Sequence, residues 1–393
     1  MRYRKFKADY LFNGKNFLDD KVLIISENGS VEDIVDIAEA GEDISFYEGI
    51  ISPGFINAHC HLELSHLQNM IPERTGLIDF VLAVVSQRHF SEEKILDAIK
   101  NGEKEMVKNG IVAVGDISNN SLTISQKQKN NISYYNFVET TGWLPQIADA
   151  RFEKSYSFYQ EYLNNGLKSS IVPHAPYSVS DNLWEKIIPL FPGKTVTIHN
   201  QETADEDLFF LEAAGNFTKM YKMMNIDNSF YKARKIRSVE SYFHKFSSAE
   251  SVILVHNTFT RREDLDFIQK NKSDQLISFC LCPNANLYIE NALPPVNLFL
   301  ENDCNIILGT DSLASNHQLN ILEEIKTIVK NFPGIKTESL LQWATINGAM
   351  ALQMDKELGS FEKGKTPGVV LIENVEDGKI TERSGIKNLL FKQ

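Results

Sequence analysis

The stretch PGFINAHCHLELSH at residues 53–66 decides the fold, because an apolar, strand-like run ends there in two histidines. His59 and His61 are two residues apart in this strand, so their side chains leave the same face, while Cys60 points the other way. Four later stretches also follow apolar runs and place a histidine or an acidic residue where the run ends: VPHAPYS at 172–178, TIHNQE at 197–202, LVHN at 254–257 and GTDS at 309–312. Five strands that end in metal-binding side chains are typical of the catalytic mouth of a β/α barrel.

The region around these stretches alternates strand-like and helical segments, in the rhythm of βα units. The strand candidates are 51–59, 111–117, 133–139, 169–174, 195–200, 251–256, 276–282 and 305–310. Eight is the strand number of a TIM-type barrel. Amphipathic or charged stretches such as 92–108 and 319–331 lie between most of the strands and are predicted to be helical. The sequence therefore predicts an α/β fold with a (β/α)8 TIM-type barrel over residues 53–358.

Both ends of the chain have a different pattern. Residues 1–52 contain short alternating runs separated by polar or glycine-containing breaks, and residues 359–393 contain the similar run GKTPGVVLIEN. We expect the two ends to meet in one small β-sandwich that flanks the barrel.

The connection at residues 203–248 is far longer than the usual link between elements, and we expect it to be helical. It is rich in aromatic residues and methionines. These side chains either cover the barrel or form a lid over an apolar substrate. Phe209, Phe210 and Met220 could accordingly pack together or stack on a ring.

The composition excludes several classes of function. The chain has 393 residues, of which 42% are hydrophobic and 23% charged, with a formal charge of −12 and a pI of about 5.3. Because lysine and arginine are dispersed among acids, we expect a small-molecule substrate and no nucleic-acid or membrane partner. No apolar run approaches the ~20 residues that span a bilayer, and the start lacks the features of a signal peptide. The four cysteines have no paired framework, which predicts free thiols in a reducing cytoplasm.

Four of the strand-end side chains form a candidate metal site. His59, His61, His199 and Asp311 would supply three imidazoles and one carboxylate, with a position left for water. This set suits zinc and ferrous iron, and we expect one divalent ion per chain, zinc in preference to iron. Taken singly, Asp311 could be a helix N-cap and His199 a buried structural histidine. Their joint occurrence at strand ends favours the metal site.

Two further side chains could assist a metal-activated water. A bound divalent cation lowers the pKa of its water from ~15.7 toward ~7, and the released proton needs an acceptor. Glu202 follows His199 by three residues and is the candidate proton shuttle. His256 ends the sixth strand and could orient the hydroxide or polarise the substrate. Asp311 could both bind the metal and accept the proton of the water.

PGFINAHCH, HNQE, LVHN, CPNAN and GTDS together resemble the amidohydrolase superfamily. The closest likeness is to the mononuclear branch that includes cytosine, guanine and S-adenosylhomocysteine deaminases and the s-triazine chlorohydrolases. The resemblance implies the same four metal ligands, with Glu202 as the acid and base and His256 beside the attacking hydroxide. No lysine suited to carboxylation precedes VPHAPYS, which argues against the binuclear branch. A homodimer is compatible with this architecture.

HAPYS and GTDSLASN look most like deaminases of adenine-type nucleosides. The resemblance implies that His174 contacts the substrate ring, with a buried structural histidine as the alternative. In related enzymes a glutamate after the first motif holds the ribose hydroxyls, but LIDFVLAVVSQRHF at 77–90 has none. Arg88 in this stretch either pairs with a substrate carboxylate or is a surface charge. Aminodeoxyfutalosine carries a carboxyphenyl group and is therefore the expected substrate. Glu63 shares the face of the two histidines of its strand and could also line the pocket.

Two alternatives keep the barrel and change the function. The same site could release chloride from a triazine, or act as a cyclic-amide hydrolase of the guanine deaminase or imidazolonepropionase type. A catalytically inactive scaffold would have lost metal ligands, and here every expected ligand is present.

Overall fold

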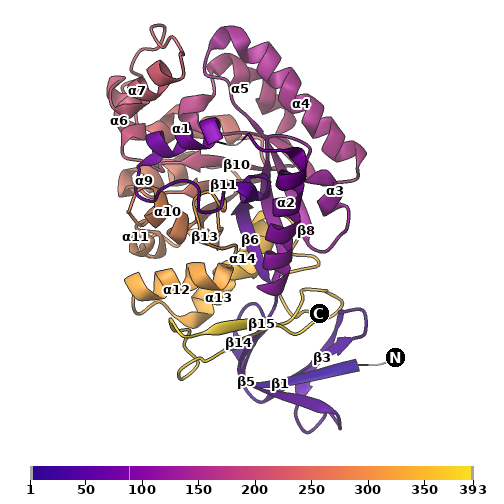
Figure 1. Cartoon of the computed structure of the whole chain (residues 1–393). Helices are drawn as coiled ribbons and strands as arrows, with labels where there is room; N and C mark the ends of the chain where they lie inside the picture. The colour runs from indigo at the N-terminus through magenta and orange to yellow at the C-terminus, as the bar shows by residue number, and fades with distance from the viewer. Residues whose placement is uncertain (1–2, 88, 391–393) are drawn as a thin grey trace.

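Eight parallel strands form the centre of the protein (Figure 1), as seen in a computed structural model that describes residues 3–87 and 89–390. They belong to two four-stranded sheets with the orders β6-β7-β8-β9 and β10-β11-β12-β13. The strands are β6 (Phe55–Cys60), β7 (Ile111–Ser118), β8 (Ser133–Thr140), β9 (Ser169–Pro173), β10 (Thr195–Asn200), β11 (Ser251–His256), β12 (Leu276–Leu281) and β13 (Asn305–Leu308). Most are buried along their whole length, because helices cover their outer face. The predicted set of eight strands is confirmed.

Backbone contacts join the two sheets into a barrel. The N–H groups of Thr310 and Asp311 both donate to the carbonyl of His59 at 3.1 Å, which links the end of β13 to β6. At the other seam, the N–H of His199 on β10 donates to the carbonyl of His174 after β9, at 2.9 Å. These contacts lie at the carboxyl ends of the strands, so the predicted motifs meet at one mouth.

The first barrel strand begins later than predicted. Residues 51 and 52 belong to β5 (Ile44–Ser52) of the flanking sheet, and β6 starts at Phe55. Pro53 and Gly54 separate the two strands. A Cβ on Gly54 would lie 2.3 Å from Cγ1 of Val112 and 2.8 Å from the carbonyl oxygen of Pro367, so the close packing of this link requires a glycine.

Helices surround the barrel (Figure 1). They are α1 (Leu77–Gln87), α2 (Glu92–Lys108), α3 (Ile124–Lys127), α4 (Ala148–Asn164), α5 (Asp181–Ile187), α9 (Arg262–Asn271), α10 (Pro283–Ile289), α11 (Val296–Glu301), α12 (Ile321–Asn331), α13 (Thr337–Ala344) and α14 (Ile346–Ala351). The helix predicted at 92–108 is confirmed. The one predicted at 319–331 begins at Ile321, because the Asn320 side chain caps it by accepting from the N–H of Leu322.

Both ends of the chain build one seven-stranded sheet below the barrel in Figure 1. Its strands are β1 (Tyr3–Phe12), β2 (Phe17–Leu18), β3 (Lys21–Ser26), β4 (Val31–Asp36), β5, β14 (Val370–Glu373) and β15 (Gly385–Asn388). Antiparallel pairing of β14 with β5 joins the C-terminal part to the N-terminal part. The sheet folds over an apolar core that includes Phe6, Leu23, Ile51 and Leu371.

The long insertion is only partly helical. It contains α6 (Asp205–Glu212), α7 (Asn216–Met223), α8 (Ser238–Tyr242) and a 3-10 turn at Phe243–Phe246. Residues 226–237, predicted to be mostly helical, are irregular. Phe209, Phe210 and Met220 are buried in a cluster that also includes Phe80 of α1, so the insertion packs against α1. Among the residues that the structure describes, no helix is long and apolar enough to cross a membrane.

Candidate active site

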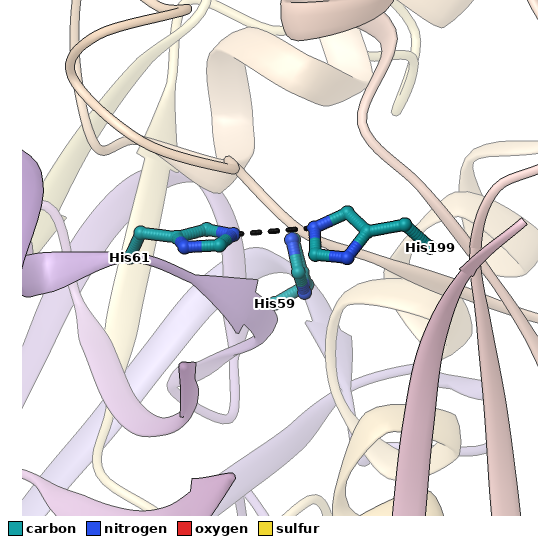
Figure 2. A group of neighbouring side chains, drawn as sticks. All are labelled: His59, His61 and His199. Atoms are coloured by element: carbon teal, nitrogen blue, oxygen red, sulfur yellow. Dashed lines mark hydrogen bonds between the residues drawn. The ribbon is translucent and has the colours of Figure 1, made fainter. Parts of the chain in front are cut away.

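Four side chains from the first, fifth and last strands of the barrel converge at its mouth. His59 and His61 come from β6 and the residue after it, His199 from β10, and Asp311 from the turn after β13. Figure 2 shows the three imidazoles facing one another, with 3.3 Å between Nε2 of His61 and Nε2 of His199. Oδ1 of Asp311 lies 3.4 Å from Nε2 of His59 and 3.3 Å from Nε2 of His61.

These separations fit a tetrahedral metal ion. Zinc–nitrogen bonds of about 2.0–2.1 Å place neighbouring tetrahedral ligands about 3.3–3.4 Å apart. Both ring nitrogens of His59 are buried without a hydrogen-bond partner, which is costly unless one of them binds a cation. The residues present therefore fit one divalent ion.

The backbone around the site is shaped to aim these side chains. Asp311 and His256 adopt left-handed φ angles of +56° and +73°, which are uncommon for residues other than glycine. They turn the chain sharply at the ends of β13 and β11. A Cβ on Gly309 would lie 2.8 Å from Cβ of His59, so the close packing of β13 against β6 requires a glycine there.

Burial keeps the imidazoles neutral. It lowers the pKa of His61 to about 3 and that of His174 to about 4, and it holds the pKa of His199 well below its usual range. Neutral imidazole is the form that binds a metal. Burial works against the charge of Asp311, but contacts with His59 and the neighbouring imidazoles hold its pKa well below the usual range.

Glu202 and His256 form a pair beside the four converging side chains. Oε1 of Glu202 lies 3.6 Å from Nε2 of His256, and both side chains are buried. Burial raises the pKa of Glu202 well above its usual range, so that it can hold a proton at neutral pH. Nδ1 of His256 lies 2.9 Å from Oδ1 of Asn286, an acceptor, which leaves the lone pair of Nε2 directed at the site. Asn286 comes from the CPNAN stretch, whose role in holding His256 could not be predicted from the sequence.

The site opens into a cavity of about 360 Å³, here called the metal-side cavity. This volume is within the range of small-molecule sites. Helices α1 and α7 supply an apolar wall that includes Phe80, Val84 and Met220. His174 also lines the cavity, and its Nδ1 lies 2.9 Å from Oγ of Ser178. Phe209 and Phe210 are buried away from it.

A second cavity of about 310 Å³, the outer cavity, adjoins the first. The two share a partition, which consists of Glu63, Leu64, Asn119, Glu139, Thr141 and Arg151. Arg151 and Lys154 of α4 are exposed where the outer cavity meets solvent. Arg88, the cation predicted to bind substrate, lies outside the described residues.

The polar part of the partition is a buried hydrogen-bonded cluster. The backbone N–H of Asn119 donates to both carboxylate oxygens of Glu63, at 3.1 and 3.0 Å. The side-chain amide of Asn119 donates to Oε2 of Glu139 at 2.9 Å. Burial raises the pKa of both glutamates to about 7. Glu139 was not predicted from the sequence, although it lies near the end of β8 as the histidines lie near the ends of their strands.

This chain is similar to known proteins in both sequence and fold. The sequence profile of the Amidohydrolase family matches residues 50–388. A 5-methylthioadenosine/S-adenosylhomocysteine deaminase of Thermoanaerobacter pseudethanolicus is 27% identical over 344 residues, which cover 82% of this chain and 73% of that protein. The fold is similar to that of aminofutalosine deaminase of Helicobacter pylori in complex with methylthio-coformycin (TM-score 0.79, 21% identity, 95% and 93% of the two chains). It is also similar to an adenosine deaminase of Xanthomonas campestris with bound zinc (TM-score 0.70, 19% identity, 94% and 84%). Because the family profile spans most of its length, this chain belongs to the amidohydrolase family.

Proposed function

We propose that this protein is a metal-dependent hydrolase that removes the exocyclic amine of an adenine-type nucleoside and releases ammonia. One observation carries the proposal: a buried acid, Glu202, and a neutral imidazole, His256, face each other beside four side chains spaced for a tetrahedral metal. Deamination requires this combination, because an amine is a poor leaving group and must be protonated. The similar proteins that deaminate adenine-type compounds support the same reaction class.

His59, His61, His199 and Asp311 would hold the metal, and the tetrahedral spacing of their atoms favours zinc. When bound, the cation supplies a water molecule acidic enough to be deprotonated near neutral pH.

Each of the neighbouring side chains has a defined task in the reaction. The raised pKa of Glu202 lets it give its proton to the ring nitrogen next to the reacting carbon, take up one proton of the water and pass it to the leaving amine. The remaining proton of the added oxygen then returns to Glu202, which restores the protonated carboxyl. A carbon–oxygen bond forms, the carbon–nitrogen bond breaks, and the nitrogen leaves as ammonia. Nε2 of His256 accepts a hydrogen bond from the attacking water and orients it, while Asn286 holds the imidazole. His174 faces the same cavity and would contact the ring.

The shape of the cavities supports a nucleoside with a large 5′ substituent, and we propose aminodeoxyfutalosine. The outer cavity, which Leu122 and Phe158 help to line, suits an aromatic group. Exposed Arg151 and Lys154 beside the outer cavity offer positive charge to a carboxylate, and no ion pair within residues 3–87 and 89–390 engages Arg151. We also propose a cytoplasmic location, because all four cysteines are free.

Ammonia release tests the proposal. Purified protein of known metal content would be assayed with adenosine, methylthioadenosine, S-adenosylhomocysteine, aminodeoxyfutalosine, guanine and cytosine. We expect release from an adenine nucleoside, and a loss of at least about a hundredfold in Glu202→Gln, since this change removes the general acid and base. Release of ammonia from no adenine nucleoside, at about one metal ion per chain, would contradict the proposal and favour dehalogenation or cyclic-amide hydrolysis.

A further inference from the structure

Four carboxylates of the described residues line the metal-side cavity, and they are not equally available to a ligand. In the function proposed above, Asp311 binds the metal and Glu202 transfers protons, so neither is available to another part of the ligand. Glu63 accepts the backbone N–H of Asn119 with both of its oxygens. Glu139 is the remaining one, and only its Oε2 has a donor, the side-chain amide of Asn119.

Oε1 of Glu139 is buried and has no hydrogen-bond partner. It lies 3.5 Å from Nδ1 of His199. That nitrogen is 2.8 Å from the carbonyl of His174, an obligate acceptor, so the single Nδ1 hydrogen points at the carbonyl and not at Glu139. The side chain of Glu139 is only 4% exposed, so its free oxygen lacks the donor that a buried carboxyl group needs, and a hydroxyl of a bound molecule can supply one.

The position of Glu139 indicates which part of a nucleoside would supply that donor. Glu139 lies in the partition between the metal-side cavity and the outer cavity. In a nucleoside the sugar lies between the base and the 5′ substituent. With the base at the metal and the substituent in the outer cavity, the sugar would lie at this partition.

The described residues of α1 supply no alternative acceptor for a sugar hydroxyl. Helix α1 presents Leu77, Phe80, Val81, Val84 and Val85 to the cavity, all without hydrogen-bonding groups.

We propose that Oε1 of Glu139 accepts a hydrogen bond from a sugar hydroxyl of the nucleoside. Asn119 and Glu63 are positioning residues that hold the glutamate at the partition. The inference rests on the proposed function and names a specificity determinant of that same site.

The test compares adenosine with 2′,3′-dideoxyadenosine, which differ only in the sugar hydroxyls. The hydrogen bond to Glu139 is lost with the hydroxyls, so the wild type should prefer adenosine by tenfold to a hundredfold in kcat/KM, on the order expected when a buried acceptor is left without its donor. Glu139→Gln keeps the shape of the side chain and removes its charge, and we expect the preference to fall by about tenfold. In Glu139→Ala we expect the preference to disappear.

Val84→Ala is the matched control, because it alters the apolar wall of the same cavity and should change kcat/KM for both nucleosides by one common factor. Metal content is measured for every variant. A wild type without preference between the two nucleosides overturns the inference, whether or not the variants fold. So does a Glu139→Gln or Glu139→Ala protein that keeps the wild-type preference, or that loses metal and both activities together. If the wild type releases ammonia from no adenine nucleoside of the panel above, the proposed function fails, and this inference fails with it.

Discussion

Glu206 is the side chain whose replacement gives the sharpest prediction about stability. It lies in the first turn of α6 and is fully buried. Its Oε1 accepts from the backbone N–H of Gln201 at 3.1 Å and from the hydroxyl of Ser238 at 2.5 Å, while Oε2 has no partner. Burial raises the pKa of Glu206 from its ordinary value of 4.5 to about 8. The folded protein therefore holds this carboxyl protonated at neutral pH.

The sign and size of the effect follow from proton linkage. Between pH 4.5 and about 8 the folded state binds one more proton at Glu206 than the unfolded state does. The free energy of unfolding therefore falls as pH rises, by about 1.4 kcal/mol per pH unit. From pH 5 to pH 7 this single group should lower the stability of the wild type by about 3 kcal/mol.

Glu206→Gln imitates the protonated carboxyl. The amide oxygen can accept the two hydrogen bonds of Oε1, and the amide group cannot lose a proton. Other buried acids titrate in both proteins, so the difference between them isolates Glu206. We expect Glu206→Gln to gain about 3 kcal/mol relative to the wild type from pH 5 to pH 7.

Urea unfolding at pH 5, 6, 7 and 8, in a buffer of constant zinc content, measures this difference. Glu153→Gln is the control, because it makes the same glutamate-to-glutamine change at an exposed position on α4. A difference between Glu206→Gln and the wild type that stays constant from pH 5 to pH 8 would refute the reasoning, because it would mean that Glu206 is ionised in the folded protein.

Three other predictions concern the surroundings of the metal site. Lys127→Met leaves fully buried Asp116 without its cation, now 2.5 Å away, and should cost about 3–5 kcal/mol in urea unfolding. Adding Asp116→Asn should recover most of that loss, and a double variant as unstable as the single one would contradict this. Gly309→Ala pushes a methyl group against His59 and should weaken zinc binding at least about tenfold in a chelator competition; unchanged affinity would show that the backbone yields freely. Removal of the metal should lower Tm and abolish ammonia release, and added zinc should restore both; full activity of metal-free protein would exclude a role for the ion.

Much of the fold could be predicted from the sequence, for physical reasons. Parallel strands covered on both faces are continuous apolar runs, so all eight barrel strands were recognisable in the sequence. The alternating runs at both chain ends likewise predicted that the two ends form one β-structure. The resemblance to the amidohydrolases is confirmed by the family match. Errors occurred where tertiary contacts decide the local structure. The first barrel strand starts at Phe55 because β5 pairs with β14, 320 residues further along the chain.

The candidate site was predictable only where a side chain ends a strand in a motif. His59, His61, His199, His256 and Asp311 are of this kind, and the structure brings them together. Their roles as ligands remain predictions.

Side chains outside these motifs could not be recognised. Asn119 follows β7 in a turn, and Arg151 lies on a helix, so only the folded barrel brings them to a cavity. Glu139 ends a strand as a single carboxylate with no neighbouring motif.

The closure of the barrel by its first and last strands matters for chains that are incompletely synthesised or proteolytically shortened. The converging side chains come from β6, β10 and the turn after β13. The first and last strands of the barrel therefore both supply groups to the site, from positions 59 to 311. A chain that has been synthesised only up to residue 300 lacks one of these groups, however well its earlier part has folded. If these side chains hold a metal ion as proposed, an unfinished or proteolytically shortened product would lack a competent centre, and metal retention would distinguish the finished molecules in a mixed population.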